Sequence, residues 1–302
     1  MRLDIPDTEG AQSALTDMAT WQTSRLVDGM LDDQAQAITA IRAITPLVSD
    51  VVDAIALRLE AGGRLVMVGA GTSGRIAVQE AAELRPTFGW PAARAIALMA
   101  GGEGAMLAAV ENAEDDGAAG ARAMAALDLA PEDCVLGIAA SGSTPFTCGA
   151  LEQAKKAGAL TIGIVNSSEG RLAAISDHPL VIHSGAEFLA GSTRLKAGTA
   201  QKIILNLITT GTMVRLGLVY QGLMVAVEVT NAKLRKRAVR IVAEITAQPD
   251  QAAQEALEQT GWNTRAAILV AGHGLAPDEA AAMLAATSGN LARAIDAVAA
   301  AP

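Results

Sequence analysis

Two glycine-rich loops carry the side chains best suited to chemistry. Their residues of interest are Gly71, Thr72 and Ser73 in GAGTSG, and Ser141, Ser143 and Thr144 in ASGSTPF. A phosphate needs several short hydrogen-bond donors around one tetrahedron, and Ser or Thr hydroxyls supply them together with the backbone N–H groups of a helix start. Helix capping would explain one such loop. Two matched loops instead predict a monophosphate site.

The first loop also matches a nucleotide-binding pattern. From Gly69 to Gly74 it fits the G-x-G-x-x-G sequence of dinucleotide-binding folds. Those folds carry an acidic residue about twenty positions further on, which holds a ribose. Here the region after Arg85 reads PTFGWPAARA, and the next acid is Glu103. A monophosphate is therefore favoured over a nucleotide cofactor.

The carboxylates are less informative than the hydroxyls. Glu80 and Glu83 lie three residues apart and can share a helix face, whereas Glu111 and Glu114 belong to the acidic run AAVENAEDD. From this pattern alone, both groups are expected to be solvated faces. The three His and two Cys residues lack the spacing of a zinc site or a disulfide framework. No metal and no cofactor are expected.

Repeated strand-to-loop junctions must position the two loops. Continuous apolar runs of strand length begin RLVMVGAG, CVLGIAASGSTPF, LTIGIVNSSEGRL and PLVIHSGAE. Four such junctions in order predict a parallel sheet with helices on both faces, a three-layer α/β fold. In such folds ligands bind in the crevice beyond the carboxyl ends of the strands.

Helical spacing of apolar residues flanks this sheet region on both sides. It dominates residues 11–62 and returns after about residue 238 as short Ala-rich segments, which we interpret as three or four helices. We therefore predict an N-terminal helical lead-in over 1–50, an α/β domain over 51–238 and a small C-terminal helical module over 239–302.

Composition narrows the class of protein. Half of the 302 residues are hydrophobic but only 2% are aromatic, which suits helices packed closely on a parallel sheet. The net charge of −9 argues against nucleic-acid binding. The absence of eighteen consecutive apolar residues, and an N-terminus reading MRLDIPDTEG, argue against a membrane span and a signal peptide. We expect a cytoplasmic protein that does not bind membranes.

Four longer strings resemble one family. GAGTSGRIAVQEAAELRPTFG, AAVENAEDD, GIAASGSTPF and AGSTRLKAGTAQKIILN, in this order, closely resemble N-acetylmuramic acid 6-phosphate etherases, and the resemblance runs over nearly the whole chain. It implies a sugar isomerase (SIS) domain followed by a bundle like a ubiquitin-associated domain. It also implies cleavage of the lactyl ether of N-acetylmuramic acid 6-phosphate during cell-wall recycling, with Glu83 and Glu114 as the catalytic carboxylates.

One geometric point follows for these carboxylates. A helix unbroken from Gly74 to Glu83 would carry Glu83 about 13 Å away from the phosphate-binding helix start. We therefore expect a homodimer with a shared active site. Relatives commonly carry Arg where this chain has Ser143. The alternatives are a sugar-phosphate isomerase on the same fold and a non-catalytic sugar-phosphate sensor similar to the glucokinase regulatory protein.

Overall fold

A computed structural model describes residues 10, 15 and 17–300. The chain divides into two compact units. The first comprises the described residues up to Ala81 together with Ala93–Thr209, and the second comprises Ala82–Ala92 and the described residues from Thr210. No helix among the described residues has the length and apolar character needed to cross a bilayer.

A parallel sheet forms the centre of the first unit. Its strands are β1 (Leu65–Gly69), β2 (Ala95–Met99), β3 (Cys134–Ala139), β4 (Leu160–Val165) and β5 (His178–Val181), in the order β2-β1-β3-β4-β5. Every pair is parallel, so the predicted α/β fold is confirmed. The sequence analysis missed β2, an edge strand whose short AIALM run is only half-buried along most of its length.

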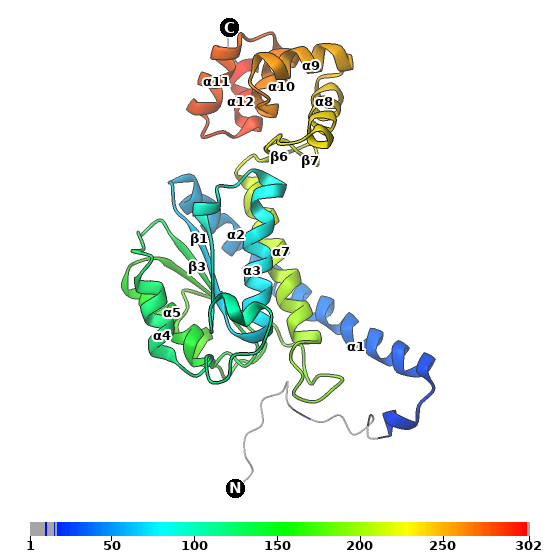
Figure 1. Cartoon of the computed structure of the whole chain (residues 1–302), viewed down its shortest axis with the longest axis vertical. Helices are drawn as coiled ribbons and strands as arrows, with labels where there is room; N and C mark the ends of the chain where they lie inside the picture. Colours follow the sequence, from blue (N-terminus) through cyan, green and yellow to red (C-terminus); the bar gives the residue numbers. More distant parts are fainter. Residues whose placement is uncertain (1–9, 11–14, 16, 301–302) are drawn as a thin grey trace. The chain divides into compact units, whose positions relative to one another are not determined.

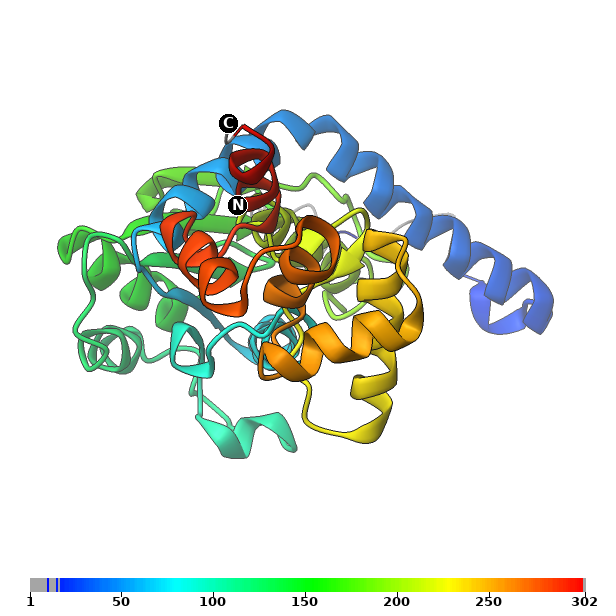
Figure 2. The same cartoon turned by 90° about the horizontal axis from the view of Figure 1, so that it is seen from above.

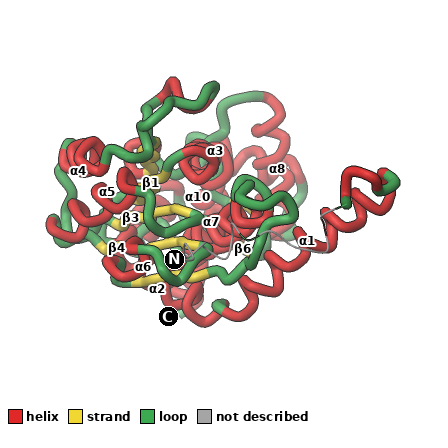
Figure 3. Tube along the Cα trace, turned by 90° about the horizontal axis from the view of Figure 1, so that it is seen from below, coloured by secondary structure: helices red, strands yellow, loops and turns green. Residues whose placement is uncertain are grey.

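Helices cover both faces of this sheet. They are α2 (Thr45–Glu60), α3 (Gly71–Phe88), α4 (Gly117–Ala125), α5 (Pro145–Lys156), α6 (Arg171–Ile175) and α7 (Lys196–Arg215), while α1 (Thr23–Ala43) extends away from the sheet (Figure 1). The strands lie between α4 and α5 on the left and α3 and α7 on the right (Figures 1 and 3). On the α4–α5 side, Val66, Val68 and Val135 share one apolar core with Met124 and Leu151. The predicted three layers are therefore present.

The second unit is mainly helical. A short antiparallel pair, β6 (Val219–Tyr220) and β7 (Leu223–Met224), is followed by five helices. These are α8 (Ala232–Thr246), α9 (Asp250–Gln259), α10 (Thr264–His273), α11 (Pro277–Ala286) and α12 (Leu291–Ala299). The five form one group, yellow to red in Figure 2, around a shared apolar core, where three or four helices were expected.

The predicted domain boundaries meet continuous helices. The division at residue 50 falls inside α2, and the division at residue 238 falls inside α8. The three-region division and the likeness of the last region to a ubiquitin-associated domain stay predictions.

A buried ion pair joins α1 to α7. The Lys196 ammonium is fully buried, 2.7 Å from an Asp33 carboxylate oxygen and 2.7 Å from the Ala186 carbonyl oxygen. Glu187 caps α7, because its two carboxylate oxygens accept the backbone N–H groups of Lys196 and Ala197 at 2.9 Å each. Removing either partner of a buried pair is costly, so the middle of α1 is firmly attached to the start of α7.

A second ionic network ties the amino ends of β1 and β3. Arg64 donates to the Asp133 carboxylate through its guanidinium, at 2.6 Å, and through its backbone N–H, at 2.7 Å. The Asp133 side chain is only 2% exposed. Burial by itself would raise the pKa of Asp133, but the hydrogen bonds from Arg64 and Ala130 and the charge of Arg64 together hold it below its ordinary value.

Replacing Asp133 by Asn should lower the free energy of unfolding by about 1.5 to 3 kcal/mol at pH 7, because the partly exposed Arg64 loses its charged hydrogen-bond partner. A carboxyl with a lowered folded-state pKa contributes stability above its unfolded pKa, near 4, and loses it as the pH falls further. The deficit should therefore shrink below about pH 4. Urea unfolding at pH 7 and pH 3 measures it, with the exposed Asp32→Asn as control. An equal deficit at both pH values would contradict the ionic explanation.

Candidate functional site

The first loop joins β1 to α3 at the carboxyl end of the sheet. A Cβ on Gly69 would lie 2.9 Å from the backbone nitrogen of Gly74, and a Cβ on Gly74 would lie 2.8 Å from the Gly69 carbonyl oxygen. Gly71 has φ +53°, a left-handed conformation that glycine adopts without strain. These glycines let α3 start directly against the strand end. The free amides of its first turn then face the crevice, where an anion is stabilised.

The second loop joins β3 to α5 at the same edge. The Ser143 backbone N–H donates to the Ser141 hydroxyl at 3.2 Å, and Thr144 is the N-cap residue of α5. The Thr144 side chain makes no capping hydrogen bond. A Cβ on Gly142 would lie 2.9 Å from the Cα of Gly170, so the loops after β3 and β4 pack together there. Because the Thr144 side chain makes no capping hydrogen bond, helix capping does not explain the hydroxyl at this position.

Four buried polar side chains form a continuous chain behind these loops. Ser73 donates to the Gln201 side-chain oxygen at 2.8 Å, Gln201 donates to Asn166 at 3.0 Å, and Asn166 donates to the Ser184 hydroxyl at 3.2 Å. Each of the four is less than 9% exposed. The Ser73 hydroxyl proton is thus already used inside the protein. Sequence reasoning missed Gln201, Asn166 and Ser184, whose only signal was their place at strand ends or in the AGTAQK string.

Glu114 lies next to both loops. A cavity of about 240 Å³ is lined by Gly71 of the first loop, by Glu114 and by the segment between 105 and 113. The Glu114 backbone oxygen accepts the N–H of Phe146, at 2.9 Å, two residues after Thr144. Its side chain is exposed. The structure therefore brings one predicted carboxylate together with the predicted phosphate loops.

Glu83 lies elsewhere on α3. The helix runs unbroken through it, with Gly71 twelve residues earlier, so about 18 Å of helix axis separates the two. Glu83 is exposed and does not line the cavity beside Glu114. This separation is longer than the distance expected from the sequence, because α3 begins at Gly71 rather than at Gly74.

Glu80 is not on a solvated face, so that expectation was wrong for this residue. It is 5% exposed, and its carboxylate accepts hydrogen bonds from Lys202 at 2.5 Å and from Thr209 at 2.6 Å. Both partners are on α7, which packs beside α3 and therefore converts a surface position of the sequence pattern into a buried contact. Glu80 is a brace between two helices.

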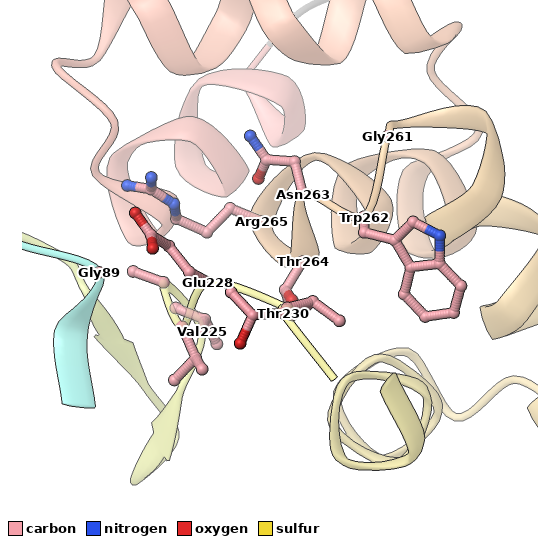
Figure 4. A pocket seen from close by; sticks show the side chains of 12 residues that line it. Gly89, Val225, Glu228, Thr230, Gly261, Trp262, Asn263, Thr264 and Arg265 are labelled. Atoms are coloured by element: carbon pink, nitrogen blue, oxygen red, sulfur yellow. The ribbon is translucent and has the colours of Figure 1, made fainter. Parts of the chain in front are cut away.

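The second unit has a cavity of its own, shown in Figure 4. It measures about 400 Å³ and is lined by Gly89, by residues 225–230 and by residues 261–265. Arg265 donates to the Gly289 carbonyl at 2.7 Å, while its buried Nε makes no hydrogen bond. None of the predicted site residues lines this cavity.

Comparison with known proteins identifies the family. The glucokinase regulatory protein N-terminal SIS domain matches residues 47–155, and the SIS domain matches residues 108–211. An N-acetylmuramic acid 6-phosphate etherase of Deinococcus radiodurans is 46% identical over 94% of this chain and 93% of its own length. The chain belongs to the N-acetylmuramic acid 6-phosphate etherase family. A second etherase of this name, from Rubrobacter xylanophilus, is 48% identical over 88% of both chains.

Solved structures support the fold. A Bacteroides fragilis protein described as a phosphosugar isomerase involved in capsule formation aligns with a TM-score of 0.52 and 22% identity, over 67% of this chain and 95% of its own. Its likeness concerns the fold alone. Family membership confirms the predicted SIS fold and the predicted class of enzyme, a carbon–oxygen lyase. The roles of individual residues in this etherase family member stay predictions.

Replacing Gln201 by Leu should lower the free energy of unfolding by about 1 to 3 kcal/mol, because the buried Ser73 hydroxyl loses its acceptor and the buried Asn166 side-chain oxygen loses its donor. Urea denaturation measures the change. The exposed Gln79→Leu on α3 is the matched control and should unfold like the unmodified protein. If both variants had the same stability, the buried chain would not hold the first loop.

Proposed function

We propose that this etherase family member cleaves the D-lactyl ether of N-acetylmuramic acid 6-phosphate with water, giving N-acetylglucosamine 6-phosphate and D-lactate. The observation that carries the proposal is Glu114 at a cavity beside the phosphate loops, in a chain 46% and 48% identical to the two etherases above. We further propose that the enzyme works in the cytoplasm, during cell-wall recycling.

The phosphate would bind between the two loops. Thr72, Ser141, Ser143 and Thr144 offer hydroxyls, and the first turn of α3 offers backbone N–H groups. Ser73 belongs to the same loop, but its hydroxyl proton is donated to Gln201, so only its backbone N–H is available to donate to a phosphate.

The reaction proceeds by elimination and then hydration. Ring opening of the sugar exposes an aldehyde, which makes the proton on carbon 2 acidic. One carboxylate removes that proton while a second group protonates the departing lactate oxygen at carbon 3, and water then adds at carbon 3. Each positioned proton transfer is worth about 10² to 10⁴-fold in rate. We assign Glu114 as the base at carbon 2 and Glu83 as the acid toward the ether oxygen.

A homodimer with a shared active site reconciles these roles with the positions of the two residues. Glu114 lies at the cavity and Glu83 does not, so Glu83 would act on a substrate held by the partner. The exposed side of α1 supports association, because Val27, Leu31 and Ile38 are 51%, 67% and 46% exposed. Large apolar side chains repeated along one helix are typical of protein contacts.

Incubation with N-acetylmuramic acid 6-phosphate in heavy-oxygen water should release D-lactate and place the label at carbon 3 of the amino sugar. Absence of label from carbon 3 would contradict the elimination route, and conversion to a ketose phosphate would indicate an isomerase instead. Binding without turnover would indicate a regulator.

Glu114→Gln should lower the rate by about 10² to 10⁴-fold, because it removes the base. The neighbouring Asp115→Asn is the control and should keep most of the activity.

Mixing the two inactive variants tests the shared site. Purified Glu83→Gln and Glu114→Gln chains, unfolded and refolded together, should recover about a quarter of the unmodified activity. Half of the dimers are then mixed, and each mixed dimer has one intact pair of carboxylates. Separate refolding should recover none. No recovery in mixtures shown by mass spectrometry to contain mixed dimers would mean that both carboxylates act within one chain.

A further inference from the structure

Arg75 follows the first loop directly and lines the same cavity as Gly71 and Glu114. Its guanidinium is held in place by two backbone oxygens of the turn after β2. Nε donates to the Met106 carbonyl at 3.2 Å, and one terminal nitrogen donates to the Ala105 carbonyl at 2.8 Å. The side chain is half-buried. Its position is therefore fixed before any ligand arrives.

The charge of Arg75 is not neutralised by the protein. Across the part of the chain that the structure describes, no carboxylate lies within ion-pair distance of this guanidinium. Both of its partners are neutral carbonyls. A guanidinium has five N–H donors, so most of them remain free to meet an anion at the cavity.

Arg75 is also the only Lys or Arg among the described residues that line this cavity, whereas Glu111 and Glu114 line it as well. Two carboxylates would repel an anionic group that entered alone. A planar guanidinium binds a carboxylate through two parallel hydrogen bonds. The cavity is thus suited to a carboxylate-bearing ligand only at the Arg75 side.

The proposed substrate carries two anionic groups. The phosphate has its site at the two hydroxyl loops, and the lactyl group brings a carboxylate that the amino-sugar product lacks. We propose that Arg75 binds this lactyl carboxylate and so distinguishes the substrate from the product. This inference rests on the proposed function. Holding the carboxylate also restrains the ether oxygen, which belongs to the same lactyl group.

Arg75→Gln tests the assignment, because it removes the charge while keeping a hydrogen-bonding side chain. The value of kcat/KM for N-acetylmuramic acid 6-phosphate should fall by about 10- to 150-fold, the usual effect of losing a hydrogen bond to a charged group. Inhibition by N-acetylglucosamine 6-phosphate should change by less than about 3-fold, because this ligand has no carboxylate to lose. Arg122→Gln, at an exposed position on α4, is the control and should alter neither value.

An equal loss of affinity for substrate and product would overturn the proposal and assign Arg75 to holding the turn at Ala105 and Met106. An unchanged kcat/KM would overturn it too. A second measurement does not depend on folding of the variant: the unmodified enzyme should bind the lactyl amide analogue at least about 10-fold more weakly than the acid. Equal binding would overturn the assignment. Failure of the proposed function is distinguishable, since it would appear as absence of lactate with the unmodified enzyme.

Discussion

The close approach of α3 to the end of β1 is the constraint on which the rest of the site depends. Gly69 and Gly74 leave no room for a side chain between them. Because the helix starts there, its unpaired amides and Arg75 belong to one turn beside the cavity that Gly71 and Arg75 line. A larger residue at either glycine would displace that turn, and the cavity, the proposed phosphate loops and the partners of Arg75 would no longer meet.

Buried polar contacts then join elements that are far apart in the sequence. Ser73 reaches Ser184 through Gln201 and Asn166, so the ends of β1, β4 and β5 share one hydrogen-bond chain. Such networks are rigid when every member is satisfied, because an unpaired polar group is costly inside a protein. The hydroxyls that remain free, such as that of Thr144, stand at the surface of an otherwise fixed frame.

Local sequence patterns predicted much of this fold. Apolar runs followed by glycine turns identified four of the five strands, because strands that are buried on both faces of a parallel sheet appear as continuous apolar runs. The edge strand β2 escaped because its run is short and half-buried. The hydroxyl loops were found by residue type, whereas Gln201 and Asn166 depend on contacts across 128 and 35 residues, which no local spacing reveals. Glu80 was misjudged for the same reason, since its burial depends on α7.

The contacts between Glu80 and α7 also restrict Glu83, one turn further along α3. Lys202 and Thr209 on α7 donate hydrogen bonds to the Glu80 carboxylate. Rotation of α3 about its axis would therefore break the ion pair between Glu80 and Lys202. Glu83 follows Glu80 by three residues on that same helix. The exposed position of Glu83 on α3 is therefore fixed before any sugar binds. In the role that we propose for Glu83, the helix cannot move toward the sugar, so the groups that bind the substrate would have to place the ether oxygen within reach of this carboxyl.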